Sequence, residues 1–233
     1  MAGLKAPKGN FSNSEFKKQE PLEPGSYPGR LVQVIDLGVQ AQKPYKGQDK
    51  PPVHMIMTTY ELVDTFMLDE DGEEMEDKPR WISETFPLHS LNSDLAKSTK
   101  RYKALDPDLE HDGDWTELIG SPANITIAQN EHDGKVYENI SAVTPMRPKE
   151  VAKLPELKND PRVFSMENPD MELWEKIPQW IREKIQQSLN FSATPLAGLV
   201  KGVKAEKKAE KVAKKAEPDP DMAQGDEEED APW

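Results

Sequence analysis

The chain has 233 residues and a formal net charge of −13, with 35% hydrophobic and 31% charged residues. This length supports one ordinary domain with appendages, and a mean hydropathy of −0.81 is too polar for a core that runs through all of it. No run of about 18 apolar residues is present and no apolar stretch follows a basic start, so we expect neither a membrane span nor a signal peptide. The absence of cysteine excludes disulfides and thiolate chemistry, which fits a reducing compartment such as the cytoplasm.

The first predicted elements are a loose arm and three strands. Residues 1–24 hold Gly, Pro, Lys and Asn with two isolated Phe and predict a flexible N-terminal arm. Residues 27–38 carry β-branched side chains between Gly and Pro and predict the first strand, and residues 53–63 predict the second. The pair Asp71-Gly72 is a hairpin cue that leads into a third strand over residues 80–88.

A helix and two more strands follow. Residues 91–105 predict a helix that ends just before Pro107. Residues 123–129 and 136–143, separated by a second Asp-Gly pair, predict the last two strands. Five strands with a helix between the third and fourth match an OB-type barrel, a fold that binds oligonucleotides, although other small barrels also have five strands. We therefore expect a mainly β protein whose residues 25–147 form a five-stranded OB-type barrel, with added helices.

The rest of the chain predicts a helical extension, a linker and a tail. Residues 148–191 are a Pro-rich connector followed by apolar residues close to helical spacing, which Pro178 should split or kink. We expect this stripe to pack on the barrel, with a partner-binding helix as the alternative. Residues 192–216 predict a Lys-rich linker. Residues 217–233 predict an acidic tail that stays disordered because it cannot bury enough apolar surface to offset its ordering entropy. The stripe consists of Leu173, Trp174, Ile177, Ile181, Ile185 and Leu189.

Charge is divided unevenly along the chain. The tail has eight acidic residues and no Lys or Arg, whereas residues 201–216 hold seven Lys and two Glu. Residues 1–200 therefore carry a net charge of −10. A nucleic-acid site on the folded part must then be a local patch.

Catalytic and metal-binding motifs are missing from the sequence. The four histidines are scattered with no pair at ligand spacing, and the Asp-Gly sequences that resemble metal loops are better explained as turns. We find no Gly-rich phosphate loop with Lys, no Gly-x-Ser-x-Gly and no nucleophile–base pair. We therefore expect no catalytic residues, no metal, no cofactor and no enzymatic activity.

Cations and aromatic side chains gather in segments that an OB-type barrel would bring together. Its oligonucleotide groove is formed by the face of strands two and three with the loops joining strands one–two and four–five. Cations there follow the phosphates, and aromatic rings stack on bases, each stack stabilising by about 1–3 kcal/mol. The predicted DNA-binding residues are Arg30, Lys43, Tyr45, Lys46, Lys50, Arg80, Trp81, Lys97, Lys100, Arg101, Tyr102, Lys103, Lys135 and Tyr137.

Several of these residues have an alternative interpretation. Trp81 faces outward if the alternating apolar residues of its strand face the core, but it could point inward instead. Tyr102 could pack its helix onto the barrel, and the cations of residues 97–103 could form a solvated face. For Arg30, both a contact with DNA and a position in the core stay open.

The acidic end predicts a second binding element. A polyanion imitates a nucleic-acid backbone, and a terminal Trp with its α-carboxylate is an anchor for a small pocket on another protein. A solubilising tail is the alternative. The predicted partner-binding residues are Asp226, Glu227, Glu228, Glu229, Asp230 and Trp233.

Four strings of the folded part and the terminus are distinctive together: GSYPGRLVQVIDLG (25–38), KPPVHMIMTTYELVD (50–64), DKPRWISETFPLHSLNSDLAKSTKRYKALDP (77–107), GSPANITI (120–127) and the final DEEEDAPW. On these, the chain resembles the single-stranded DNA-binding proteins of tailed phages, which have an OB fold and an acidic, aromatic-ended tail. It departs from them in ending on Trp where such tails usually end on Phe. The resemblance implies coating of exposed strands during replication and recombination in the host cytoplasm. It also implies recruitment of a polymerase, helicase/primase or nuclease through the tail.

Two functions of different classes stay open. The first is a protein that binds single-stranded DNA without sequence specificity, and whose tail occupies the groove until DNA expels it. The second is an acidic protein–protein adaptor with no nucleic-acid role, which the net charge of −10 on residues 1–200 favours. The sequence also leaves open the oligomeric state, with a homodimer as one option, and the choice between DNA and RNA.

Overall fold

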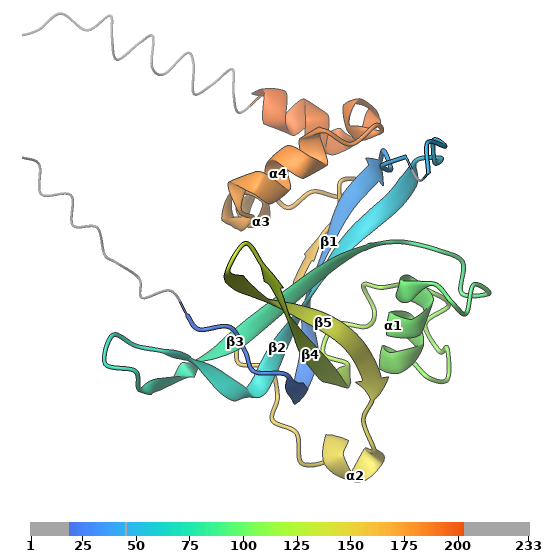
Figure 1. Ribbon diagram of the computed structural model, residues 1–233. Helices are drawn as coiled ribbons and strands as arrows, with labels where there is room; N and C mark the ends of the chain where they lie inside the picture. Colours follow the sequence, from blue (N-terminus) through green and yellow to red (C-terminus); the bar gives the residue numbers. More distant parts are fainter. Residues whose placement is uncertain (1–18, 45, 203–233) are drawn as a thin grey trace, which may run out of the picture.

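The computed structural model describes residues 19–44 and 46–202, whose arrangement Figure 1 shows. All five predicted strands and the predicted helix are present, in the predicted order, and most strands are longer than predicted. No helix in the described part of the chain is long and apolar enough to cross a membrane. The strands are β1 (Gly25–Gln40), β2 (Val53–Leu68), β3 (Glu74–Pro87), β4 (Pro122–His132) and β5 (Lys135–Pro145), with helix α1 (Lys97–Leu105) between β3 and β4.

The strands form one open sheet in the order β3-β2-β1-β4-β5. Each neighbouring pair is antiparallel. A short sixth strand that the sequence did not predict, β6 (Arg162–Phe164), pairs in parallel with β1. Within the described residues no ladder joins β3 to β5. The mainly β class is therefore confirmed, but the expected closed barrel is wrong: the structure has an open sheet.

Charged side chains connect the two edge strands where the ladder is missing. Arg101 of α1 donates to both carboxylate oxygens of Glu84 on β3, at 2.8 and 3.3 Å, and to the carbonyl oxygen of Ile140 on β5 at 3.3 Å. Arg80 of β3 donates to the carboxylate of Glu138 on β5 at 3.0 Å. We call this gap between β3 and β5, bridged by side chains, the seam.

The first buried cluster fills the space between the sheet and α1. Tyr60, Phe86, Tyr102 and Ile125 are almost completely buried in it. The ring of Trp115 lies 5.3 Å from the ring of Phe86 and 5.4 Å from that of Tyr102 between centroids. These aromatic contacts hold α1 against β3, which positions the cations of α1 next to the seam.

The helical extension packs on the sheet near the end of β1 (Figure 1). Helices α3 (Met171–Lys176) and α4 (Gln179–Gln186) are separated at Pro178, where the sequence predicts a break. The carboxylate of Asp170 caps α3 by accepting from the backbone N–H of Leu173 at 3.1 Å. Smaller elements are α2 (Pro148–Val151) and η1 (Phe191–Ala193). The second buried cluster consists of Ile35, Leu37, Met57, Phe164, Met166, Leu173, Trp174, Ile177, Ile181, Ile185, Leu196 and Val200.

Leu189 differs from the rest of the predicted stripe because it is exposed. Five of the six stripe residues belong to the second cluster. Helix α4 ends at Gln186, so the helical spacing that the sequence pattern assumes does not reach position 189.

Gly38 allows β1 and the extension to approach closely. Its φ is +72°, and it follows a register shift in the pairing of β1 with β2. A Cβ atom at this position would lie 2.5 Å from the side chain of Met166 and 2.8 Å from that of Asn190. The same Asn190 side chain accepts from the backbone N–H of Val39 at 2.8 Å. Any other residue here would meet both an unfavourable backbone conformation and a steric conflict.

Candidate nucleic-acid interface

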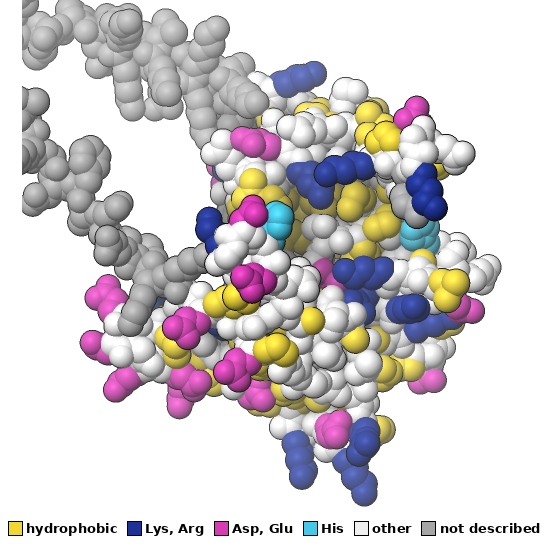
Figure 2. Space-filling model, in the orientation of Figure 1, with side chains coloured by type: hydrophobic (Ala, Val, Ile, Leu, Met, Phe, Trp, Pro, Cys, Tyr) yellow, Lys and Arg dark blue, Asp and Glu magenta, His cyan; other side chains and the backbone are white. Residues whose placement is uncertain are grey.

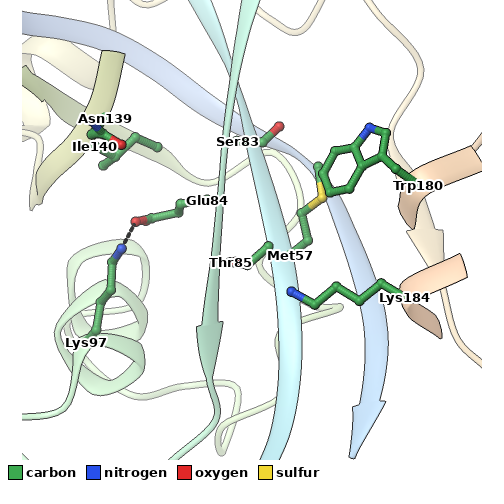
Figure 3. Close-up of a pocket in the computed structure, with 9 residues that line it drawn as sticks. All are labelled: Met57, Ser83, Glu84, Thr85, Lys97, Asn139, Ile140, Trp180 and Lys184. Atoms are coloured by element: carbon green, nitrogen blue, oxygen red, sulfur yellow. Dashed lines mark ion pairs between the residues drawn. The ribbon is translucent and has the colours of Figure 1, made fainter. Parts of the chain in front are cut away.

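A groove of about 530 Å³ lies between the seam and α4 (Figure 3). Strands β2 and β3 contribute its floor, and α1, β5 and α4 contribute its walls. It therefore runs over the strands that carry the ligand groove of an OB-type barrel. The lining residues are Met57, Ser83, Glu84, Thr85, Lys97, Asn139, Ile140, Trp180 and Lys184.

Trp180 is the most exposed aromatic side chain among the described residues, with 60% of its surface accessible. Figure 3 shows its ring and the side chain of Lys184 projecting from α4 toward the strands. Residues four apart lie on the same helix face, so the ring and the ammonium group share one wall. An aromatic ring beside a cation is the arrangement that stacks a base and neutralises its phosphate.

The sequence analysis missed Trp180 and Lys184, although a signal for them was present. Ile181 and Ile185 belong to the buried stripe, and Trp180 and Lys184 each precede one of them by one residue. At 100° per residue this places them at the edge of the stripe rather than inside it. A large ring at such a position is exposed unless another element covers it.

Lys97 faces the groove from α1, on the other side of the strands. Its Nζ lies 2.6 Å from a carboxylate oxygen of Glu84, whose other oxygen accepts from Arg101. One carboxylate thus balances two cations, and this wall carries an excess positive charge. Lys100, one turn along α1, is exposed and has no ion pair in the part of the chain that the structure describes.

The loop residues predicted to bind DNA are exposed but are not part of the groove lining. Lys43, Lys46 and Lys50 are exposed between β1 and β2. Lys135 and Tyr137 are exposed on the β4–β5 hairpin. None of these five residues lines the groove itself. Tyr45, which was predicted to bind DNA, lies outside the described residues, and so do the tail residues 226–233.

Three residues predicted to bind DNA are buried and have structural roles. Arg30 is 8% exposed and donates to the carbonyl oxygen of Pro155 at 2.8 Å, which ties the connector to β1. Arg101 is 5% exposed and bridges the seam. The Tyr102 hydroxyl, in a fully buried side chain, accepts from the backbone N–H of Gly113 at 2.9 Å. We therefore correct the prediction for these three: their polar groups are engaged inside the fold.

Trp81 faces away from the core, as strand alternation predicts, but its ring is covered. Its indole N–H donates to a carboxylate oxygen of Glu61 at 3.1 Å, and the guanidinium of Arg162 lies 5.0 Å from its ring centroid. The carboxylate of Glu61 also accepts from the backbone N–H of Lys158 at 2.7 Å. The connector thus crosses this face of the sheet, and a base cannot stack on Trp81 unless Arg162 moves.

Two further cations that were predicted to bind DNA, Arg80 and Lys103, form ion pairs outside the groove. Arg80 donates to the carbonyl oxygen of Glu20 at 2.7 Å as well as to Glu138. Lys103 lies 2.7 Å from a carboxylate oxygen of Asp94 in an exposed pair. Arg80 is therefore part of the seam, whereas the exposed ion pair of Lys103 contributes little to stability.

The molecule has basic and acidic regions on one face (Figure 2). Lys and Arg side chains lie above and to the right of the hollow in the middle of this face, and acidic side chains and a His border it on the left. Further acidic side chains gather toward the β2–β3 hairpin at the lower left. Residues 69–77 of that hairpin contain seven Asp and Glu. A polyanion would thus be attracted to the hollow and repelled by the hairpin, although the net charge of the whole chain is negative.

His54 and Asp36 form a polar pair where β2 begins. The His54 Nε2 and Asp36 Oδ1 atoms are 2.6 Å apart. The hydrogen bond to Asp36 raises the pKa of His54. Burial by itself raises the pKa of Asp36, but hydrogen bonds from His54 and from the backbone N–H of Gly38 outweigh it, so that this pKa is lowered overall. Both shifts stabilise the charged pair in the folded state.

Within the described residues, no three His, Asp or Glu side chains are grouped in a way that could hold a metal ion. No protein-family model matches the chain, and no curated protein does either.

Proposed function

We propose that the protein binds single-stranded DNA without sequence specificity, in the groove between the seam and α4. One observation carries this proposal: the exposed ring of Trp180 and the ammonium groups of Lys184 and Lys97 line one groove across β2 and β3. Unpaired bases expose their faces to such a ring, whereas the bases of a duplex are stacked on each other. Because every base has such a face, stacking does not depend on sequence.

The strand order supports the same function. The order β3-β2-β1-β4-β5, with α1 between β3 and β4, supports an interpretation as an OB-type sheet. We infer that the protein is a variant of this type in which Arg101 and Arg80 bridge the seam in place of a β3–β5 ladder. The helical extension then supplies a wall that the open sheet alone would lack.

The biological role follows the resemblance found in the sequence. We propose that the protein coats and protects exposed strands during phage DNA replication and recombination in the host cytoplasm, and that it performs no catalysis. Residues 217–233 would act as a tethered competitor that occupies the groove when DNA is absent, since a tether gives an effective concentration in the mM range. DNA would then release Trp233 for a pocket on a replication protein.

A polarisation titration with fluorescent oligo(dT) tests both parts of this proposal. The full chain and a chain ending at residue 216 should both bind, with affinity that falls steeply as salt rises, because phosphate contacts release counterions. The shortened chain should bind more tightly at low salt. If neither chain binds in dilute buffer, the DNA-binding function is refuted and the adaptor becomes the better hypothesis. If both bind equally at every salt concentration, only the competitor role of the tail is refuted.

A further inference from the structure

A second pocket, of about 300 Å³, lies at the β2–β3 hairpin and shares no lining residue with the groove. Its apolar wall is formed by Met67 and Leu68 at the end of β2 and by Met75 at the start of β3, all half-buried. Met67 and Met75 are direct partners in the antiparallel pairing. These three large apolar side chains lie at the tip of a hairpin that is otherwise rich in acids. Such an apolar surface favours the binding of a partner.

The described chain begins at the wall of this pocket. The side-chain amide of Gln19 donates from Nε2 to the carbonyl oxygen of Leu68 at 2.8 Å, and its Oε1 accepts from the Leu68 N–H at 3.0 Å. Gln19 also lines the pocket. The first described residue, Gln19, is therefore fixed at this pocket by both polar atoms of its side-chain amide.

The segment before Gln19 has the chemistry that the pocket requires. Phe16 lies three residues before Gln19, and three residues span at most about 10 Å, so its ring is within reach of the pocket that Gln19 lines. Phe11 lies eight residues before Gln19, so holding it in the pocket would require ordering a longer loop. Residues 1–18 contain one acid, Glu15, and four cations, which are Lys5, Lys8, Lys17 and Lys18.

We propose that the pocket is the docking site of the chain's own N-terminal arm, with Phe16 packed against Met67 and Met75 and the lysines of the arm against the acidic hairpin. The two partners are complementary in charge, since residues 69–77 carry seven acids. The methionine side chains favour an aromatic occupant because sulfur packs well against a ring.

A disulfide experiment tests the docking in the full chain, which has no cysteine of its own. Lys17→Cys and Glu70→Cys are introduced together, and oxidised glutathione serves as the oxidant, so that two thiols are oxidised and one glutathione disulfide is reduced. A disulfide requires the two Cα atoms to come within about 7 Å. We expect an intramolecular bond, seen as a monomer of higher mobility on a non-reducing gel.

The main comparison is between chains with and without the Phe16 ring. Adding Phe16→Ala to this pair should slow bond formation about ten- to a hundredfold, the factor that burial of one Phe ring provides. Adding Phe11→Ala, the matched control on the same arm, should leave the rate unchanged. Equal rates in the Phe16→Ala and Phe11→Ala chains would overturn the proposal, and so would covalent dimers as the main product, which would assign the pocket to a second copy.

Methionine-methyl NMR provides an independent measurement without cysteines. The methyl signals of Met67 and Met75, assigned by Met→Leu substitution, should shift in the Phe16→Ala chain and stay in place in the Phe11→Ala chain. Unchanged signals in Phe16→Ala would refute the docking. A shift on removal of residues 203–233 instead would give the pocket to the Lys-rich segment. Neither measurement uses DNA, so their outcome is independent of the proposed function.

Discussion

Replacing Trp180 by alanine should weaken single-strand binding while the fold stays intact. The ring is 60% exposed and belongs to neither buried cluster, so the free energy of unfolding should change by less than about 1 kcal/mol. Loss of one base stack costs about 1–3 kcal/mol of binding free energy, which is about a 5- to 150-fold increase in Kd. Trp180→Phe should lose less, because it keeps an aromatic face.

The assay is a polarisation titration with oligo(dT) on the chain that ends at residue 216, in which the tail does not compete. Leu189→Ala is the matched control, since Leu189 is 59% exposed on the same extension and does not line the groove. Trp174→Ala is the contrasting variant. Its buried ring stacks on Phe164 with 5.5 Å between centroids, so we expect it to lower the free energy of unfolding by about 3–5 kcal/mol.

Two results would refute the assignment of the groove as the DNA-binding site. If Trp180→Ala and Leu189→Ala bind oligo(dT) with the same affinity as the parent, no base stacks on Trp180 and the groove is not the binding site. If both substitutions weaken binding equally, the effect belongs to the extension in general, and the stacking argument is also wrong. Thermal unfolding of each variant confirms that the compared chains are folded.

Three further predictions concern Lys184 and Lys100, the close approach at Gly38 and the His54–Asp36 pair. Lys184→Gln and Lys100→Gln should each reduce the slope of log Kd against log salt by about 0.7; if the slope is no smaller than in the control Lys149→Gln, the lysine concerned does not contact phosphate. Gly38→Ala should cost about 2 kcal/mol or more, because a positive φ alone costs roughly 1–2 kcal/mol and the added methyl group overlaps Met166; urea unfolding measures this, and a cost near zero would contradict the close approach. The raised pKa of His54 means that the pair contributes fully below the ordinary His value of 6.5 and loses its contribution as pH rises through the raised pKa. The lowered pKa of Asp36 means that its contribution is present above 3.8 and is lost as pH falls through the lowered value. Urea unfolding at pH 6 and pH 8 should therefore show that the parent loses stability as the pH rises, and that the His54→Gln variant loses less. Equal losses in the two proteins would exclude the pair as the cause.

The positions of the elements could be predicted because their signals are local. The β-branched runs between Gly and Pro, the two Asp-Gly pairs and the break at Pro178 all act within a few residues, and the structure has strands, hairpins and a helix break at these places. The short strand β6 escaped prediction because its three residues pair with β1, which lies about 130 positions earlier in the chain. A pattern within the strand itself carries no information about such a partner.

The cations of α1 show why the candidate site was harder to predict. The sequence presents Lys97, Lys100 and Arg101 as one basic run. Helical geometry places Lys97 and Arg101 on one face, and the structure turns that face toward Glu84, so that Arg101 is buried while Lys97 reaches the groove. Among the cations of α1, Lys100 alone is exposed without an ion pair to another described residue.

The sequence by itself determined the mainly β class, the order of the elements and the separation of an acidic end from a basic segment, because each of these follows from neighbouring residues. Tertiary structure alone decided that the sheet stays open at the seam, that Arg30, Arg101 and Tyr102 belong to the interior, and that Trp180 faces the strands. Each of these outcomes depends on contacts between side chains dozens to more than a hundred positions apart. The relative placement of whole elements brings such side chains together, and no local pattern encodes that placement.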